Sequence, residues 1–195
     1  GHTCEQIDDL LFATIDDWKR EREATAPRDT FTLADLATAY PTLKPPLIDG
    51  LARVGEVINV IANTKVGKSW FVYYLALCVI TGRYLFGRFK TTRGKVCIVD
   101  NELHAETLAS RLLFIASAMG IAREDVEQEL IIKTLRGNLR SFGEVASELR
   151  EQFEPGEFVL IVFDAKYRFA EQGQSENDNA SEARFYNEAD RFAAA

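Results

Sequence analysis

The stretch EVINVIANTKVGKSWFVYYLALCVI, residues 56–80, decides how this chain is interpreted. Inside it, Ala62–Ser69 reads ANTKVGKS, one residue away from G-x-x-x-x-G-K-[S/T], the pattern of a loop that wraps phosphate groups. The β-branched run Glu56–Ala62 predicts a strand before the loop, and residues 69–82 predict a helix after it. A strand, a tight loop and a helix N-terminus are the context that such a loop requires.

The residue types in the loop suit ATP and Mg²⁺. Gly67 allows the backbone to approach a phosphate closely, Lys68 reaches the β- and γ-phosphates, and Ser69 ligates Mg²⁺. Lys65 either contacts phosphate or a neighbouring subunit, or it is an exposed, solvated lysine. The predicted nucleotide-binding residues are Asn63, Thr64, Lys65, Val66, Gly67, Lys68, Ser69 and Trp70.

Ala62 stands where the pattern has its first glycine. An alanine adds only a methyl group if its backbone angles are ordinary, and it is costly only if φ is positive. We therefore expect the substitution to weaken the pattern while the loop keeps its ability to bind ATP with Mg²⁺.

The chain after Gly55 alternates strands and helices. This alternation predicts right-handed crossovers and a mostly parallel sheet flanked by helices, which is an α/β fold. The apolar run 158–164 is expected to be a strand covered on both faces. The predicted strands are 95–100, 130–135 and 158–164, and the predicted helices are 104–119, 141–153 and one from about residue 179.

Residues 1–44 are predicted to form an N-terminal helical arm and linker, and residues 45–195 the core domain. Apolar residues at helical spacing predict a helix over residues 4–23, and Thr32 is expected to cap a short helix over residues 32–40. Prolines and glycines break residues 40–55, which predicts an extended arm.

Two carboxylates should complete the site. Asp164 ends an apolar strand, where it can hold Mg²⁺. Glu102 follows the strand 95–100, and the carboxyl ends of parallel strands share one edge, so Glu102 can orient or deprotonate a water there. Asp100 and Glu106 compete for that role. We expect Glu106 in the first turn of the next helix and Asp100 as a supporting group.

Composition narrows the class of protein. The chain has 195 residues and a net charge of −7, which argues against attraction of nucleic acid by the whole surface. Its three cysteines are widely spaced, so a disulfide framework or a zinc site is not expected, and a reducing cytoplasm suits it. The most apolar stretch, Trp70–Ile80, is too short to span a membrane, which needs about 20 residues.

Taken together, these residues resemble the RecA-like P-loop ATPases, and among them the AAA-type family related to the hexameric replicative helicase RepA. The resemblance covers roughly residues 45–195. It rests on the order of the phosphate loop, CIVDNELHAETLASRL with Glu102, LIVFDAKYRF with Asp164 and Arg168–Phe169, and SENDNA with Glu176–Asn177.

The resemblance implies roles for four residues. Lys68 and Ser69 would bind phosphate and Mg²⁺, Asp164 would bind Mg²⁺, and Glu102 and Lys68 would be catalytic. It also implies a homo-oligomeric ring, usually a hexamer, with ATP at the subunit interfaces.

The loop from Lys166 to Ser181 allows single-stranded DNA as a further partner, because it places basic residues beside aromatic ones. The alternative, which we favour, is a surface loop whose Tyr167 and Phe169 pack into the core or against a neighbouring subunit.

By the same resemblance, a further strand with a γ-phosphate-sensing residue lies between the loop strand and the Asp164 strand, and an arginine finger follows it. The sequence ends at Ala195, before either of them. We therefore expect a fragment whose sheet has a gap at that place, with unpaired backbone groups on both sides.

Several functions stay open at this stage. The first is an ATP-hydrolysing motor domain of the RepA-like group, acting on DNA in replication, repair or a mobile element. The second is a RecA-like regulatory ATPase without nucleic acid. A small-molecule kinase would need an acceptor pocket and an arginine-rich lid, and neither is visible. The last is a nucleotide-binding module without turnover.

Overall fold

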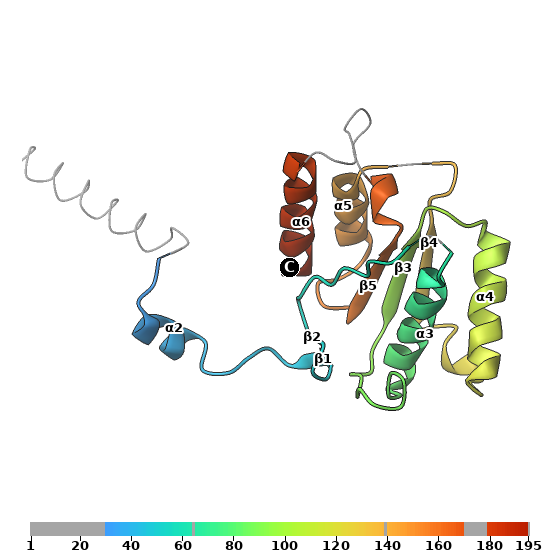
Figure 1. Cartoon of the computed structure of the whole chain (residues 1–195), viewed down its shortest axis with the longest axis horizontal. Coiled ribbons are helices and arrows are strands. Elements are labelled where there is room, and N and C mark those ends of the chain that lie inside the picture. The colour runs from blue at the N-terminus through green and yellow to red at the C-terminus, as the bar shows by residue number, and fades with distance from the viewer. Residues whose placement is uncertain (1–29, 64, 139, 170–178, 195) are drawn as a thin grey trace, which may run out of the picture. The chain divides into compact units, whose positions relative to one another are not determined.

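The computed structural model describes residues 30–63, 65–138, 140–169 and 179–194 (Figure 1). The chain divides into two compact units, residues 1–43 and 44–195. The described part of the first unit contains α2 (Leu33–Ala39), which begins after Thr32 with the capping box that Thr32 and Asp35 form. The short helix predicted here is confirmed, whereas the helix predicted over residues 4–23 lies outside the described residues.

The second unit is built on a parallel sheet of three strands. They are β3 (Val96–Asp100), β4 (Leu130–Thr134) and β5 (Leu160–Asp164), in the order β4-β3-β5. The register places Asp100 opposite Asp164 at the carboxyl ends of β3 and β5. The predicted α/β fold is confirmed, and the three strands predicted after the phosphate loop are present.

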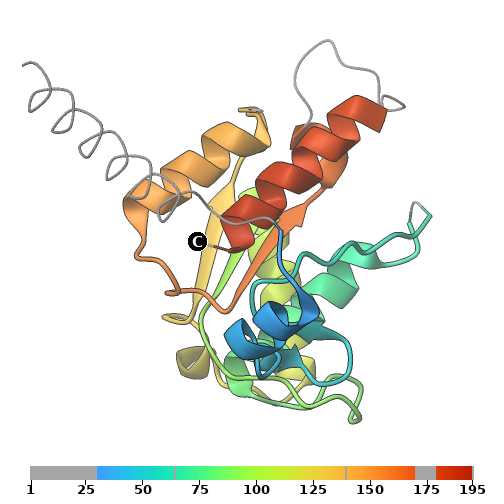
Figure 2. The same ribbon diagram turned by 90° about the vertical axis from the view of Figure 1, so that its left-hand side faces the viewer.

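Helices cover both faces of this sheet. Figures 1 and 2 show α3 and α4 on one face and α5 and α6 on the other. Two short 3₁₀ helices, η1 (Arg123–Asp125) and η2 (Lys166–Phe169), lie in the connections. The long helices are α3 (Lys68–Thr81), α4 (Ala105–Ala118), α5 (Phe142–Gln152) and α6 (Asn179–Ala193).

Strand β3 forms the centre of the core. Its side chains alternate, so that Val96 and Ile98 pack with α3 and α4 while Cys97 and Val99 pack with α5 and α6. All four are fully buried. Because both faces are covered, β3 is apolar along its length until it ends at Asp100, which brings a carboxylate to the edge of the sheet.

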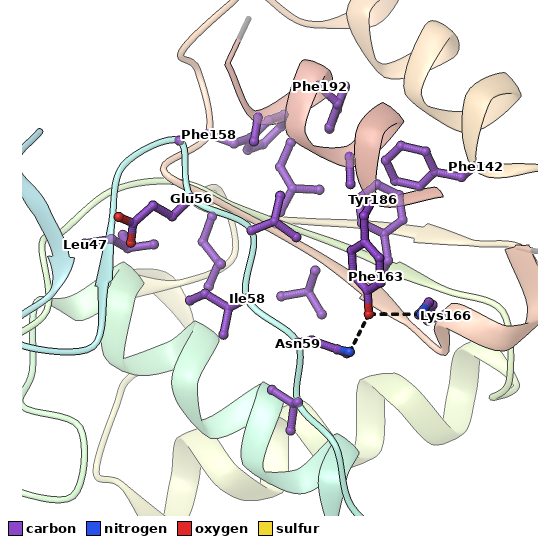
Figure 3. A pocket seen from close by; sticks show the side chains of 18 of the residues that line it. Leu47, Glu56, Ile58, Asn59, Phe142, Phe158, Phe163, Lys166, Tyr186 and Phe192 are labelled. Atoms are coloured by element: carbon purple, nitrogen blue, oxygen red, sulfur yellow. Dashed lines mark hydrogen bonds between the residues drawn. The ribbon is translucent and has the colours of Figure 1, made fainter. Parts of the chain in front are cut away.

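The strand predicted over Glu56–Ala62 is wrong. These residues belong to no strand, and Val57, Ile58 and Ile61 are exposed. A strand needs a hydrogen-bonded neighbour, and a cleft of about 1000 Å³ separates this segment from β5 (Figure 3).

The cleft lies where a gap in the sheet was expected. Apolar side chains of β5 and of α6 line it, and Lys68 and Asp164 are also among its lining residues. The strand predicted over residues 158–164 was expected to be covered on both faces. This expectation is wrong, because β5 lines the cleft and its residues are only half-buried.

The arm predicted over residues 40–55 is not extended throughout. A short antiparallel hairpin joins β1 (Pro46–Ile48) to β2 (Ala52–Arg53), and Gly50 turns with φ of 74°. Leu47, Ile48 and Ala52 are buried in the core beside α3, so the hairpin closes one end of the domain.

Two expectations from composition can be compared with the described residues. Within the described residues, Cys78 and Cys97 are free and buried. Across the described ranges, no helix has the length and the apolar character needed to cross a membrane.

The capping box of α5 gives a first testable prediction. Ser141 Oγ accepts from the backbone N–H of Glu144 at 3.3 Å, and the Glu144 carboxylate accepts from the Ser141 backbone N–H at 2.8 Å. Replacing Ser141 by alanine should lower the free energy of unfolding by about 1 kcal/mol, measured by urea denaturation. Ser147→Ala, an exposed change within the same helix, is the control and should not destabilise. Equal effects of the two substitutions would contradict the capping role.

Candidate nucleotide-binding site

The loop between Ala62 and α3 has the geometry of an anion-binding turn. Gly67 lies at the N-cap of α3 with φ of 95°, a left-handed conformation that favours glycine. Gly67 provides no side-chain cap, so the N–H groups of the first turn can bind a ligand. The Lys68 ammonium folds back over the loop and donates to the carbonyl oxygen of Ala62 at 3.0 Å. The loop thus offers N–H donors and a cation on one turn.

Ala62 fits its position without strain. Among the described residues, the non-glycine residues with positive φ are Lys65 and Phe86, and Ala62 is not one of them. Because a β-carbon is costly only where φ is positive, the alanine adds a methyl group without opposing the backbone conformation.

Asp164 ends β5 with one oxygen that has no protein partner. Its Oδ2 atom is buried and accepts no hydrogen bond within the described structure. Burial raises the pKa of the Asp164 carboxyl, the Ser69 side chain and the Lys68 ammonium act in the opposite direction, and the nearby carboxylates of Asp100 and Glu102 raise it further. A buried acceptor without a donor is costly, so this oxygen is suited to a positively charged ligand.

Asp100 fixes the turn that follows β3. The residue is fully buried, and its Oδ1 atom accepts from the backbone N–H groups of Glu102 at 2.9 Å and Leu103 at 2.7 Å. Its Oδ2 atom accepts from the Tyr73 hydroxyl at 2.9 Å. Burial raises the pKa of the Tyr73 phenol, and Asp100 adds to the rise, so the hydroxyl keeps its proton and donates at neutral pH.

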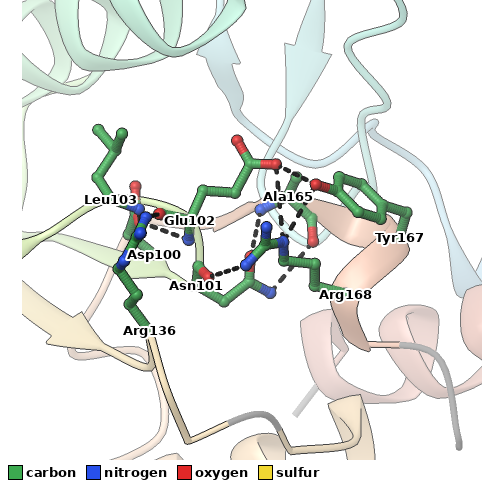
Figure 4. A network of polar contacts seen from close by, with 8 residues as sticks. All are labelled: Asp100, Asn101, Glu102, Leu103, Arg136, Ala165, Tyr167 and Arg168. Carbon is green, nitrogen blue, oxygen red and sulfur yellow. Dashed lines mark hydrogen bonds and ion pairs between the residues drawn. The ribbon is translucent and has the colours of Figure 1, made fainter.

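The ends of β3 and β5 are linked by side chains (Figure 4). Asn101 Nδ2 donates to the carbonyl oxygen of Ala165 at 3.2 Å, and the Ala165 N–H donates to Asn101 Oδ1 at 2.9 Å. Arg168 Nη1 donates to the carbonyl oxygen of Asn101 at 3.0 Å. These bonds hold the residues after β3 against the residues after β5, and Glu102 lies in the first of these segments.

Comparison with known protein families agrees with this geometry. Residues 20–195 match the family of AAA domains. The chain belongs to the AAA domain family. No curated protein sequence matched it. Membership supports a nucleotide-binding, ATPase-like function, carried on the parallel sheet and flanking helices described above.

AAA ATPases usually use Mg²⁺ with their nucleotide, and two residues of this AAA domain fit that ion. Asp164 Oδ2 is an acceptor without a donor, and the Ser69 hydroxyl lies beside the same carboxylate. No group of three or more His, Cys, Asp or Glu residues that could hold a metal occurs in the described part of the domain. Magnesium suits such a site because it is typically bound by one or two carboxylates together with phosphate oxygens and water.

The structure brings four of the predicted site residues together, namely Lys68, Ser69, Glu102 and Asp164. Lys68, Ser69, Asp100 and Glu102 each influence the pKa of Asp164, so all four lie near its carboxylate at the carboxyl edge of the sheet. Their assignment to phosphate, metal and water stays a prediction.

Three other predicted or competing residues, Glu106, Trp70 and Thr64, are not among those near Asp164 in the described structure. Glu106 is exposed in the first turn of α4, as expected, which separates it from the buried Asp100. The Trp70 indole packs beside α4, with the Phe114 ring 5.9 Å away and the Arg111 guanidinium 5.3 Å from the Trp70 ring centre, so its side chain faces away from the loop. Thr64 lies outside the described residues.

Sequence reasoning missed Tyr167 as a partner of Glu102. The Tyr167 hydroxyl donates to Glu102 Oε1 at 2.6 Å, and the Tyr167 side chain is half exposed. Of the two side chains expected to pack into the core or against a neighbouring subunit, Phe169 is buried in the core, whereas packing of Tyr167 against a neighbouring subunit stays a prediction. The available signal was that η2 follows Asp164 directly, so its side chains had to lie near the residues after β3.

Proposed function

We propose that this AAA domain binds ATP with Mg²⁺ and hydrolyses the bond between the β- and γ-phosphates. The observation that carries the proposal is the unpartnered Oδ2 atom of Asp164. The Asp164 carboxylate lies beside Ser69, which is in the first turn of α3. Glu102 stands at the same edge of the sheet, where a water-activating carboxylate is required.

Each residue then has a defined task. The N–H groups of the loop and the first turn of α3 bind phosphate oxygens, and Lys68 moves from the Ala62 carbonyl to the β- and γ-phosphates. Ser69 and Asp164 hold Mg²⁺, which neutralises phosphate charge when bound. Glu102 orients the attacking water and accepts its proton.

We further propose that the domain works as a motor of the RepA-like helicase group, in a ring of identical subunits on single-stranded DNA. The order of motifs supports this assignment: Glu102 follows β3, Asp164 ends β5, and Arg168–Phe169 follows in η2. The acidic stretch with Glu176 and Asn177 belongs to the same pattern and lies outside the described residues.

A regulatory ATPase without nucleic acid is the second candidate. The net charge of −7 favours it. The basic residues beside the aromatic ones are held by protein partners: Arg168 donates to the Asn101 carbonyl and the Tyr167 hydroxyl, and Lys166 donates to Glu182 and the Tyr186 hydroxyl. DNA stimulation of turnover separates the two candidates.

Replacing Lys68 by alanine should lower ATP affinity about 100-fold, since an ammonium–phosphate hydrogen bond contributes about 3 kcal/mol. Turnover should fall with it. The measurement is binding of a fluorescent ATP analogue together with release of inorganic phosphate, with and without single-stranded DNA.

Lys90→Ala, an exposed lysine outside the loop, is the control and should behave as the parent. Turnover that needs Lys68 and rises with DNA supports the motor. Turnover that needs Lys68 but ignores DNA supports the regulatory ATPase, and binding or turnover that ignores Lys68 contradicts the proposed site.

A further inference from the structure

The 3₁₀ helix η2 directs one side chain at the carboxylate that is proposed to activate water. Tyr167 projects from η2, and its hydroxyl donates to Glu102 Oε1 at 2.6 Å. Tyr167 is 51% exposed, and within the described residues the group found over its ring is the Arg168 guanidinium, 5.6 Å from the ring centre. Tyr167 therefore adds little to the hydrophobic core, and its polar contacts account for its placement.

The Tyr167 hydroxyl accepts one hydrogen bond and donates another, so the direction of both bonds is defined. Arg168 Nε donates to it at 3.1 Å, so the hydroxyl accepts from a cation and donates to a carboxylate. Hydrogen bonds in such a chain polarise one another, which strengthens the final bond to Glu102. Arg168 itself lies 3.9 Å from Glu102 Oε1, too far for a direct hydrogen bond, so the tyrosine makes the close contact.

The backbone of Glu102 is fixed from both sides. Its N–H donates to Asp100 Oδ1 at 2.9 Å, and its carbonyl oxygen accepts a hydrogen bond from the Arg136 guanidinium. With the backbone and Oε1 both held, the side chain retains little rotational freedom. Figure 4 shows the carboxylate between the turn after β3 and the Tyr167 ring.

Hydrogen bonds also connect the segment that carries Tyr167 to the segment that carries Glu102. The paired hydrogen bonds between Asn101 and Ala165, with the bond from Arg168 to the Asn101 carbonyl, join η2 to the turn that carries Glu102. A shift of one segment is therefore transmitted to the other, and the distance between phenol and carboxylate is preserved.

We propose that Tyr167 is a positioning residue that holds Oε1 of Glu102 so that Oε2 faces the attacking water. This inference rests on the proposed function. In the step it serves, the water oxygen forms a bond to the γ-phosphorus and its proton passes to Glu102 Oε2. The bond from the γ-phosphorus to the bridging oxygen breaks, and ADP leaves with that electron pair.

The first test is Tyr167→Phe in the full chain. Removing the hydroxyl frees the carboxylate to rotate, and we expect kcat to fall about tenfold, because small misplacements of a reacting group are costly. The dissociation constant for ATP and the urea midpoint should stay at the parent values, since Tyr167 is half exposed and, among the described residues, its hydroxyl bonds to Glu102 and Arg168 rather than to a predicted nucleotide-binding residue. Tyr84→Phe, a tyrosine of similar exposure whose hydroxyl makes no recorded contact in the described structure, is the matched control.

The second test combines Tyr167→Phe with Glu102→Gln in single-turnover measurements. If Tyr167 acts through Glu102, its substitution should have no further effect once the carboxylate is gone. Equal fold losses in both backgrounds would overturn the inference, because they would show that Tyr167 acts elsewhere.

The outcomes separate this inference from the proposed function. Turnover that requires Lys68 and Glu102 but ignores Tyr167→Phe overturns the inference alone. A weaker ATP affinity at unchanged kcat also overturns it, since the tyrosine would then bind nucleotide. A parent chain without Lys68-dependent ATP turnover overturns the proposed function, and the inference with it.

Discussion

Glu102→Gln is expected to reduce ATP turnover by about 10²–10⁴-fold while ATP binding persists. A general base typically contributes an acceleration of this size, and glutamine cannot accept the proton of the attacking water. The side chain keeps its shape and one carbonyl oxygen for the Tyr167 hydroxyl, so the contact at Oε1 should survive. The measurement is phosphate release at saturating ATP, with binding of a fluorescent ATP analogue measured alongside it.

The matched control is Glu106→Gln. Both residues are glutamates near the start of α4, but Glu106 is exposed in its first turn, whereas Glu102 is held in the network at the carboxyl edge of the sheet. We expect Glu106→Gln to retain turnover within about twofold, as for an exposed helix residue outside the site. The reverse pattern would move the catalytic role to Glu106, and full turnover in both variants would exclude either carboxylate as the base.

The sequence predicted structure correctly where the conformation of an element depends on residues within or next to that element. Helix α5 begins after Ser141 because the capping box with Glu144 is local, and Gly82, with φ of 68°, ends α3. The strand ends at Asp100 and Asp164 were found because a polar residue follows a buried apolar run. Glu102 followed from the rule that parallel strands share one edge.

The sequence was uninformative where the conformation of a segment depends on pairing with another segment of the chain. Residues 56–62 have strand-like composition, yet they lie across a cleft from β5 and form no strand. Composition describes a chain's preference, whereas a strand also requires a paired backbone. The hairpin β1–β2 was missed for a different reason. The Asp49–Gly50 dipeptide is a recognised turn signal, but the surrounding prolines led to the prediction of an extended arm.

The position of η2 shortly after Asp164 puts its side chains near the residues after β3, but the particular contact between Tyr167 and Glu102 could not be predicted from sequence. It joins residues 65 positions apart through the hydroxyl of a half-exposed side chain, and neither hydrophobic periodicity nor a motif marks it. Burial reasoning assigns an aromatic residue next to a strand to the core. That reasoning was correct for Phe169, which packs against Phe163, because that ring has no polar group to satisfy.

Asp100→Ala should lower the free energy of unfolding by about 3–5 kcal/mol, the largest stability effect we expect in this domain. The substitution leaves the Tyr73 hydroxyl and the N–H groups of Glu102 and Leu103 without their acceptor, and each buried unsatisfied group costs about 1–3 kcal/mol. The removed side chain is fully buried, so water cannot readily replace it. The measurement is urea denaturation at pH 7.

Two further substitutions, Asp100→Asn and Tyr73→Phe, separate the contributions of individual hydrogen bonds to this loss in the free energy of unfolding. The asparagine keeps an oxygen that can accept from the two N–H groups of the turn, and Tyr73→Phe removes only the phenol donor, so each should cost clearly less than Asp100→Ala. Because the same turn fixes the backbone of Glu102, Asp100→Asn should also retain more ATP turnover than Asp100→Ala at a temperature where both variants are folded. If the two substitutions at Asp100 destabilise equally, the negative charge rather than the hydrogen-bonded turn stabilises this part of the domain, and the support that Asp100 gives to Glu102 would have to be electrostatic.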